Sequence, residues 1–253
     1  MTVVDLRHHK ADYGYDGDYR AVSAPTVATI VGAVSAGLLA SAAGSLVRGK
    51  PITALVTGGT GASLITTAAL FIRTTRVGKF EVWAGILEGL RLRGDETLLD
   101  LGCGRGAVLL TAAKLLPNGR AIGVDIWRAD QTDNFAQNTL RNAELEGVAD
   151  RVEVRTADIT DLPFDNDSVD VIVSSLVVHN IPNPADRAKA ISEAARVLRP
   201  GGRLVLADIW ATRRYVRQLR ELRWADASRR SLGWRMWWGP GLGTHLITAT
   251  KPI

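Results

Sequence analysis

The chain has 253 residues, one cysteine and a formal net charge of +5, and 46% of its residues are hydrophobic. The single cysteine, Cys103, excludes an intrachain disulfide and agrees with a reducing compartment. The positive charge is modest, and we take it as spread over several helices. It favours an anionic membrane surface at least as well as nucleic acid, so no nucleic-acid partner is expected.

Within residues 1–20, two short motifs stand out. His8 and His9 are adjacent and do not share a helix face, so no metal site is expected there. Tyr13-Gly14-Tyr15-Asp16 is open to three interpretations. In the first, the tyrosines fold over an active site as a lid. In the second, they lie at a bilayer interface, where such rings are enriched. In the third, they belong to a frayed terminus.

Two uncharged runs follow this segment. Residues 21–47 contain no charged residue over 27 positions, and residues 51–72 contain none over 22, with Arg48-Gly49-Lys50 between them. A helix that spans a bilayer needs ~20 apolar residues, so the pattern predicts a two-helix transmembrane hairpin over 21–72. Small residues at every fourth position predict the faces on which the helices meet. They are Gly32, Ala36, Ala40 and Gly44 in the first run, and Ala54, Gly58 and Ala62 in the second.

The alternative is a pair of buried helices that cap a soluble domain. The high Ala, Gly, Ser and Thr content and the Gly58-Gly59-Thr60-Gly61 run favour it, because glycine loosens a helix in water. The basic residues favour a hairpin in the cell membrane with the N-terminus and the large domain on the cytoplasmic side. The outer turn contains two basic residues, Arg48 and Lys50. The cytoplasmic flank contains six: Arg7, Lys10, Arg20, Arg73, Arg76 and Lys79.

The most informative stretch is Leu98-Leu99-Asp100-Leu101-Gly102-Cys103-Gly104-Arg105-Gly106, followed by Gly123-Val124-Asp125. It is typical of a buried strand, a glycine turn that opens a helix, and a second strand that ends in a carboxylate. Glycines allow a close approach between backbone and ligand, and an acid at the tip of the second strand is placed to hold ribose hydroxyls. The two strands therefore predict a site for a nucleoside cofactor.

The spacing distinguishes between two cofactors. The dinucleotide fingerprint is G-x-G-x-x-G, whereas this chain has G-x-G-x-G with Asp100 two residues before the first glycine. A carboxylate at ~4 Å would repel a pyrophosphate by about 1 to 4 kcal/mol but would attract an ammonium group. The pattern favours S-adenosylmethionine and opposes a nicotinamide-dependent oxidoreductase.

From about Lys79 to the C-terminus the chain resembles the class I S-adenosylmethionine-dependent methyltransferases. The family's motifs occur in order: the glycine turn, Asp125, Asp158 after a strand at 152–155, a central strand at 169–174, and the junction Arg199-Pro200-Gly201-Gly202. The resemblance implies a Rossmann-like α/β fold with helices on both faces of a seven-stranded sheet whose last strand is antiparallel. The expected domain covers residues 73–253.

The resemblance also implies the cofactor and the residues that hold it. Asp158 corresponds to the acid that receives the adenine amino group, and Trp127 is a candidate to stack on adenine, with a lid or core position as the alternative. Cys103 is expected to be a small packing residue rather than a reactive thiol. The implied S-adenosylmethionine site consists of Asp100, Gly102, Cys103, Gly104, Gly106, Asp125, Ile126, Trp127, Asp158, Ile159 and Ser174.

Periodicity and turn residues place the remaining elements. Helices are predicted at 79–92, 107–116, 133–146, 184–197 and 212–224, with residues 73–78 as the only linker after the hairpin. Strands are predicted at 204–207, 233–238 and 244–251. Trp234, Trp237 and Trp238 on the final strand pair are candidates for an acceptor pocket, for contact with lipid headgroups, or for packing over the sheet edge.

His179 is the candidate catalytic residue because it follows the fourth strand, and ligands bind at the carboxyl ends of such strands. A neutral imidazole accepts a proton at cytosolic pH, but a histidine here also serves to order the loop. Asn180 either positions the acceptor or shapes the turn. The sequence therefore predicts a membrane-anchored methyltransferase of a small, apolar acceptor. The alternatives are a non-catalytic cofactor-binding membrane module and a methyltransferase of a soluble metabolite with the hairpin as anchor or cap.

Overall fold

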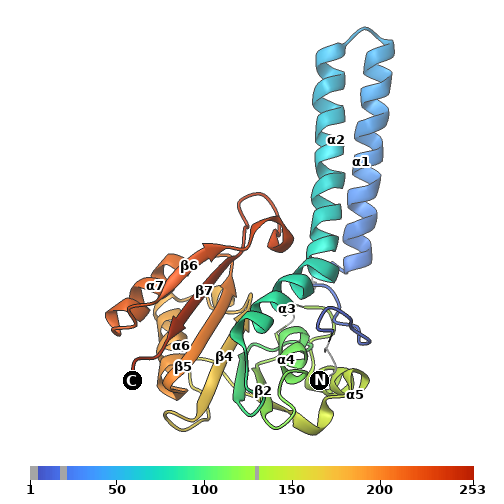
Figure 1. The fold of residues 1–253 in the computed structure, drawn as a ribbon. Helices are drawn as coiled ribbons and strands as arrows, with labels where there is room; N and C mark the ends of the chain where they lie inside the picture. The colour runs from blue at the N-terminus through green and yellow to red at the C-terminus, as the bar shows by residue number, and fades with distance from the viewer. Residues whose placement is uncertain (1–4, 18–21, 129–130) are drawn as a thin grey trace.

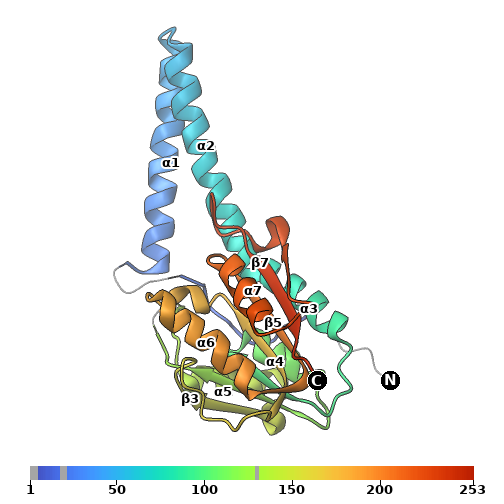
Figure 2. The ribbon, with the colours of Figure 1, turned by 90° about the vertical axis from the view of Figure 1, so that its left-hand side faces the viewer.

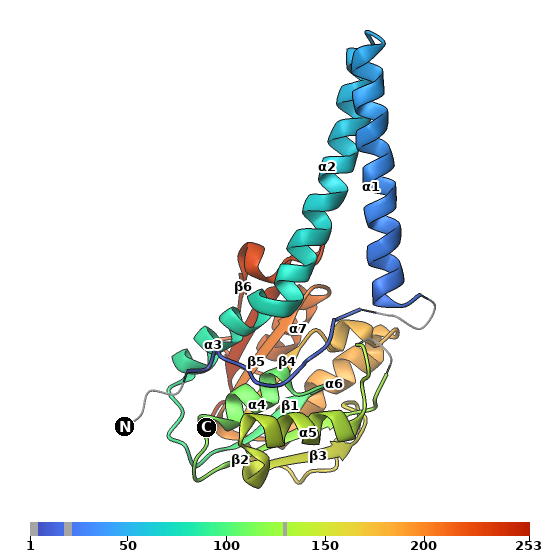
Figure 3. The ribbon, with the colours of Figure 1, turned by 90° about the vertical axis from the view of Figure 1, so that its right-hand side faces the viewer.

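The computed structural model describes residues 5–17, 22–128 and 131–253. It consists of an N-terminal segment, a long helical hairpin and an α/β domain (Figure 1). The hairpin projects away from the domain in each of three views (Figures 1, 2 and 3). Arg20 and Ala21, which belong to the predicted flank and start of the hairpin, lie outside the described residues.

The domain is built on a seven-stranded sheet of order β3-β2-β1-β4-β5-β7-β6, in which β7 runs antiparallel to its neighbours β5 and β6. The predicted seven-stranded, Rossmann-like sheet with helices on both faces is confirmed. The strands are β1 (Thr97–Leu101), β2 (Arg120–Asp125), β3 (Val152–Thr156), β4 (Val169–Ser175), β5 (Leu198–Asp208), β6 (Ser228–Ser231) and β7 (His245–Thr250).

Successive side chains of the central strands point to opposite faces of the sheet, so the hydrophobic core has two layers. In β1, Leu98 packs with the helices of one face and Leu99 with those of the other, and both side chains are fully buried. Helices α3 (Lys79–Leu90), α4 (Ala107–Ala113) and α5 (Ala136–Glu146) cover one face (Figure 3), and α6 (Pro184–Val197) and α7 (Thr212–Glu221) cover the other (Figure 2). Both faces of the sheet are therefore covered by the domain itself.

The prediction of a strand at 233–238 is wrong. Residues Gly233–Met236 form a 3₁₀ turn, and the edge strand β6 lies earlier, at Ser228–Ser231. Gly233 has φ +70°, which ends the strand geometry, and Met236 is fully buried. The apolar run of this segment therefore reflects packing around a turn and not a strand. The predicted strand at 244–251 is confirmed as β7, and an isolated bridge joins Trp237 to Gly243 ahead of it.

The hairpin consists of α1 (Ala24–Val47) and α2 (Pro51–Arg73), joined by a turn in which Gly49 has φ +67°. Ser23 caps α1 by accepting a hydrogen bond from the Thr26 N–H, and prolines start both helices. At 1.5 Å per residue, α1 is about 36 Å long, which exceeds the ~30 Å hydrocarbon core of a bilayer. Both helices are long and apolar enough to cross a membrane by length and composition.

The two helices meet along small residues, but α1 uses a different face from the predicted one. Ser35 and Ser45 are buried, whereas Ala36 and Ala40 are exposed. A Cβ on Gly61 of α2 would lie 3.2 Å from the backbone oxygen of Ser35, so glycine permits the close approach there. In α2, Ala54 and Gly58 face α1 as predicted, and Ala62 is exposed.

The predicted linker at residues 73–78 is helical. Thr74–Gly78 form a π-helical turn that continues α2 into α3, and the residues on either side of it stay in the right-handed helical region. Thr74, Thr75 and Gly78 are buried. The hairpin is thus connected to the first layer of the domain through a continuous backbone helix.

Candidate functional site

The glycine turn lies between β1 and α4, at the carboxyl edge of the parallel strands. Gly102 and Gly104 have φ +70° and +50°, in the left-handed region that favours glycine. A Cβ on Gly102 would lie 2.3 Å from the Val177 side chain, and one on Gly104 would lie 2.6 Å from Gln131 Oε1. The turn therefore requires glycine at both positions.

Asp125 ends β2 beside this turn and organises it. Its Oδ2 accepts a hydrogen bond from the Gly104 N–H at 2.8 Å, and its Oδ1 accepts one from the Trp127 N–H at 2.6 Å. The carboxylate is 9% exposed. An acid at the tip of the second strand is thus fixed against the glycine turn, as the sequence predicts.

Asp100 lies beneath the turn and is 1% exposed. Its Oδ1 has no hydrogen-bond partner among the described residues. Burial, with a smaller contribution from the nearby charge of Asp125, raises the pKa of Asp100 to about 8. A cationic group in the adjoining space would supply the missing partner and favour the carboxylate form.

A cleft of about 880 Å³ opens along this edge of the sheet. It falls within the size range of sites for small molecules and cofactors. Among the residues predicted to form the site, those that line the cleft are Asp100, Gly102, Cys103, Gly104, Asp125, Ile126, Asp158, Ile159 and His179.

Three predicted site residues are not part of the cleft wall. Gly106 starts α4, where a Cβ would lie 2.9 Å from Leu110 Cγ, so it serves helix packing. Ser174 is buried and its Oγ donates to the Leu101 carbonyl at 2.7 Å. The next residue, Ser175, lines the cleft instead, because side chains alternate along β4.

Trp127 is the third residue that differs from the prediction. Its indole Nε1 donates to Thr156 Oγ1 at 2.7 Å, and the ring packs against the core layer that contains α4 and α5. Ile126 and Ile159 supply apolar side chains to the cleft wall near Asp158. The structure therefore favours the alternative position for Trp127, outside the cleft.

Cys103 is 6% exposed, and burial raises the pKa of its thiol. Its Sγ packs against Gly123 of β2, where an added Cβ would lie 2.6 Å from the sulfur. A protonated, packed thiol matches the predicted role of a small structural residue.

His179 lies in a 3₁₀ turn directly after β4 and lines the cleft. Its Nδ1 is 2.5 Å from Asp208 Oδ1, and its backbone N–H donates to Asp208 Oδ2 at 3.0 Å. The Asp208 side chain is only 2% exposed, whereas that of His179 is 19% exposed. A buried carboxylate that holds one ring nitrogen leaves Nε2 as the nitrogen available for proton transfer.

Asp208 belongs to the candidate site through its contacts with His179, and the sequence analysis did not identify it. It ends β5 in the same way that Asp125 ends β2, after the apolar run Leu204-Val205-Leu206-Ala207. The position of this acid, directly after an apolar run, was the feature of the sequence that could have identified it. Asn180, next to His179, also lines the cleft.

Residues 5–17 form what we call the N-terminal strap, which packs on the domain rather than fraying. Leu6 and Tyr13 are 1% and 4% exposed and belong to the core layer of α3 and α4. Glu146 of α5 anchors the strap by accepting hydrogen bonds from the backbone N–H groups of Lys10 and Ala11 and from the Tyr13 hydroxyl.

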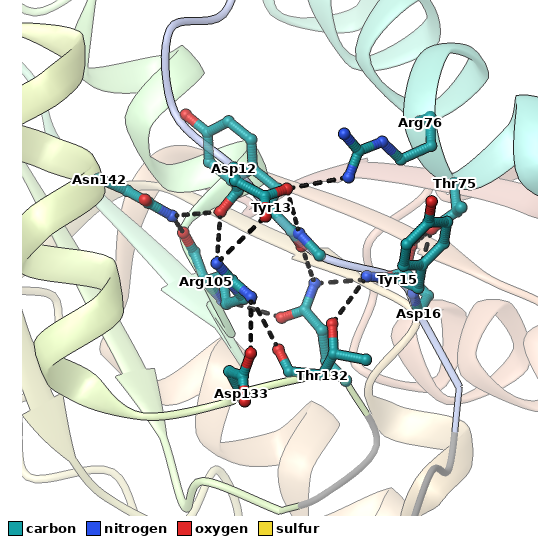
Figure 4. Close-up of polar contacts among 12 residues, drawn as sticks. Asp12, Tyr13, Tyr15, Asp16, Thr75, Arg76, Arg105, Thr132, Asp133 and Asn142 are labelled. Atoms are coloured by element: carbon teal, nitrogen blue, oxygen red, sulfur yellow. Dashed lines mark hydrogen bonds and ion pairs between the residues drawn. The ribbon is translucent and has the colours of Figure 1, made fainter. Parts of the chain in front are cut away.

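The strap is also bound to the glycine turn (Figure 4). Arg105, which lies within the turn, donates to the Asp12 carbonyl at 2.7 Å and to the Thr132 carbonyl at 3.1 Å. Further along the strap, Asp16 Oδ2 pairs with Lys79 Nζ at 2.8 Å and accepts a hydrogen bond from Thr75 Oγ1. Asp16 and Lys79 both line the cleft, a position that agrees with the lid among the three interpretations that the sequence left open.

The far end of the cleft is apolar and is formed by the hairpin and a C-terminal loop. Phe71 of α2, Trp238 and Leu242 line it. The Phe71 and Trp238 rings meet edge to face with centroids 5.9 Å apart, and Thr74 Oγ1 donates to the Trp237 carbonyl. Trp234 is 55% exposed. The guanidinium carbon of Arg73 lies over its ring, 4.3 Å from the ring centroid. The three tryptophans thus take different roles at the base of the hairpin.

Residues 99–206, which contain the glycine turn, Asp125, Asp158 and His179, match a family model described as a methyltransferase domain. This part of the chain is therefore similar to a methyltransferase domain. The matched range covers the strands from β1 to β5 that carry the cleft.

Named relatives match the same part of the chain. This part of the chain is similar to a demethylmenaquinone methyltransferase of Clavibacter sepedonicus, at 35% identity over 133 residues, which are 52% of this chain and 49% of that protein. It is similar to an arsenite methyltransferase of Halobacterium salinarum, at 36% identity over 118 residues, 46% of this chain and 28% of that protein. The chain spans half or less of the length of these relatives.

Solved structures share the fold. The geranyl diphosphate C-methyltransferase of Streptomyces coelicolor, in complex with Mg²⁺, geranyl diphosphate and S-adenosyl-L-homocysteine, matches with a TM-score of 0.53 and 21% identity. The match covers 69% of this chain and 80% of that one. At this identity the similarity concerns the fold of the methyltransferase domain.

Proposed function

We propose that this protein is a membrane-anchored methyltransferase that transfers a methyl group from S-adenosylmethionine to a small hydrophobic acceptor dissolved in the bilayer. The observation that carries the proposal is the composition of the cleft wall. One end of the cleft contains the glycine turn and its acids, and the other end contains Phe71, which belongs to the apolar hairpin itself. A single cavity thus connects the cofactor end of the domain with the base of the hairpin.

In this proposal three acids of the cleft each have their own partner on the cofactor. Asp125 holds the ribose hydroxyls, Asp100 pairs with the ammonium group, and Asp158 receives the adenine amino group. The unpartnered Oδ1 of Asp100, a residue that lines the cleft, supports this arrangement. When bound, the cofactor supplies a methyl group that is already activated on a sulfonium.

His179 is proposed to accept a proton from the acceptor or to align it. Asp208 holds the imidazole through Nδ1 and stabilises its protonated form, while Nε2 is left for the acceptor. Alignment of acceptor and methyl group is worth up to ~7 to 11 kcal/mol in near-ideal geometry, and a positioned base adds a further ~10²- to 10⁴-fold. This dyad favours a catalytic protein over a module that only binds the cofactor.

Membrane anchoring is supported by the surface of the hairpin. Large apolar side chains on both helices are exposed, among them Ile30, Leu46, Ile52, Leu55 and Val56 at 53–79%. The hairpin projects from the domain, so these side chains are not covered by it (Figure 1). A surface of this kind is unstable in water and stable in lipid. The buried-cap alternative would require a covering that the described residues do not provide.

The proposed orientation places the N-terminal strap and the methyltransferase domain together on the cytoplasmic side of the cell membrane. The strap packs on the domain through Glu146 and Arg105, so both lie at the same end of the hairpin. Arg48 and Lys50 lie at the opposite end, in the turn between α1 and α2. This distribution agrees with two membrane crossings.

The hairpin should retain the full-length protein in the membrane pellet after an alkaline carbonate wash. Replacing Leu39 and Ile65, which are 41% and 47% exposed and lie near the middle of α1 and α2, by aspartate should release much of the protein, because each aspartate in the bilayer centre costs about 2.5 to 3.5 kcal/mol. Immunoblots of pellet and supernatant measure the distribution. Leu145→Asp, at an exposed position of α5, is the matched control and should remain in the pellet. Release of the unmodified chain by carbonate would refute anchoring.

A further inference from the structure

The positive charge of the chain is concentrated in one segment and is not spread over several helices as the sequence analysis assumed. Residues 212–231 contain seven arginines and two acidic residues, and therefore a net charge of +5. The remaining 24 basic and 24 acidic residues of the chain balance one another. The whole formal net charge of the protein thus lies on α7, β6 and the loop between them.

These arginines gather on the outer edge of the domain. The apolar side of α7 is buried through Tyr215, Val216 and Leu219, so its basic residues face outward. A shallow surface pocket of about 590 Å³ is lined by four of these arginines, Arg213, Arg217, Arg220 and Arg229. Its lining contains a single acidic residue, Glu221. We call the seven residues the arginine patch: Arg213, Arg214, Arg217, Arg220, Arg223, Arg229 and Arg230.

Most of the patch is not used by the fold. Arg220 donates to the Ala227 carbonyl and Arg229 to Thr212 Oγ1, so these two stabilise the connection between α7 and β6. In the described part of the chain, no ion pair or side-chain hydrogen bond joins Arg213, Arg217 or Arg230 to another residue, and all three are exposed. Burial, with a smaller contribution from the nearby charge of Arg213, lowers the pKa of Arg229.

The patch extends to the edge of the sheet where the hairpin is attached. α7 starts directly after the carboxyl end of β5, so Arg213 and Arg214 lie close to that edge. In β6, Ser231 pairs with His245, the same residue of β7 that pairs with Asp208. The loop after β6 then turns back toward α2 (Figure 1), where the Trp237 carbonyl binds Thr74.

We propose that the arginine patch binds the phosphate groups of anionic phospholipids and holds the methyltransferase domain against the membrane surface beside the hairpin. Unpaired arginines match phosphate geometry, and each basic side chain near an anionic membrane strengthens binding about fivefold. The proximity of the exposed apolar hairpin and of exposed Trp234 at the same edge favours a lipid surface over nucleic acid. The inference rests on the proposed membrane anchoring.

Arginine footprinting tests this inference on the full-length protein without any substitution. The protein is placed in nanodiscs of phosphatidylcholine alone or with about a third phosphatidylglycerol, and is treated with phenylglyoxal. Mass spectrometry then measures the modification rate at each arginine. We expect Arg213, Arg217 and Arg230 to be modified at least fivefold more slowly in the anionic discs, and the protection to disappear at high salt. Arg91, Arg120 and Arg141, which are exposed elsewhere on the domain, are internal controls and should not change.

Two further arms identify the source of the phosphate. Equal protection by inorganic phosphate in neutral discs, or protection by a short RNA duplex but not by anionic lipid, would overturn the assignment to phospholipid. Equal modification rates in the two kinds of disc would also overturn it. Failure of the chain to incorporate into either disc would instead contradict the anchoring on which the inference rests, so the two failures are distinguishable.

Discussion

Replacing His179 by alanine should lower the maximal rate of methyl transfer by about 10²-fold or more and leave the affinity for S-adenosylhomocysteine unchanged. The imidazole is held at Nδ1 by Asp208 and lines the cleft, so its loss removes the group that is proposed to receive or orient the proton of the acceptor. Turnover with labelled cofactor and calorimetry with S-adenosylhomocysteine measure the two quantities separately.

His8→Ala is the matched control, because His8 is exposed in the N-terminal strap, and it should retain full activity. Asp208→Asn should reduce the rate less than His179→Ala, since the amide still occupies the position beside the ring but carries no charge. An unchanged rate in the His179 variant would assign this residue to loop structure alone.

Replacing Asp125 by alanine should weaken S-adenosylhomocysteine binding at least tenfold. The carboxylate is proposed to bind the ribose hydroxyls, and each charge-assisted hydrogen bond contributes about 1.5 to 3 kcal/mol. Its two oxygens also accept hydrogen bonds from the Gly104 and Trp127 backbone, so the glycine turn loses its support at the same time. Titration calorimetry at constant pH and salt provides the comparison.

Asp161→Ala removes the same charge from an exposed position near Asp158 and should bind the cofactor product like the unmodified protein. Circular dichroism of the Asp125 variant separates a local loss of binding from unfolding. Normal affinity in a folded Asp125 variant would mean that the acid does not contact the ribose. Binding of NAD with no response to S-adenosylhomocysteine would contradict the choice of cofactor.

The sheet was predictable because its strands are marked by simple signals. The buried runs of β1, β2 and β4 are bounded by glycines, acids or small residues, and α6 begins and ends at the residues that the sequence indicates. The glycine turn and Asp125 come together because adjacent parallel strands end at the same edge. Local patterns therefore sufficed for most of the domain.

The sequence was less informative wherever tertiary contacts decide the conformation. Tryptophans at 233–238 gave an apolar pattern that suggested a strand, whereas their packing around Phe71 and Thr74 of the hairpin produces a turn. Ser174 and Ser175 differ by one position in β4, and only the pairing of the sheet shows which one faces the cleft.

The N-terminal strap could not be placed from its own sequence. Its position depends on distant partners, chiefly Glu146 of α5 and Arg105 of the glycine turn. Lys79 had a predicted place at the start of a helix, but its pairing with Asp16 joins two segments that are separated by the entire hairpin. Such contacts are set by the assembled fold and carry no local signal.

The fate of the transferred methyl group decides whether the acceptor comes from the bilayer. Membranes that contain the full-length protein are incubated with S-adenosylmethionine labelled in its methyl group, and the product is divided between organic and aqueous phases. We expect protein-dependent label in an organic-soluble product, and little label from the His179→Ala variant. Label that accumulates in a water-soluble metabolite at the same rate with and without membranes would contradict the proposal that the acceptor comes from the bilayer.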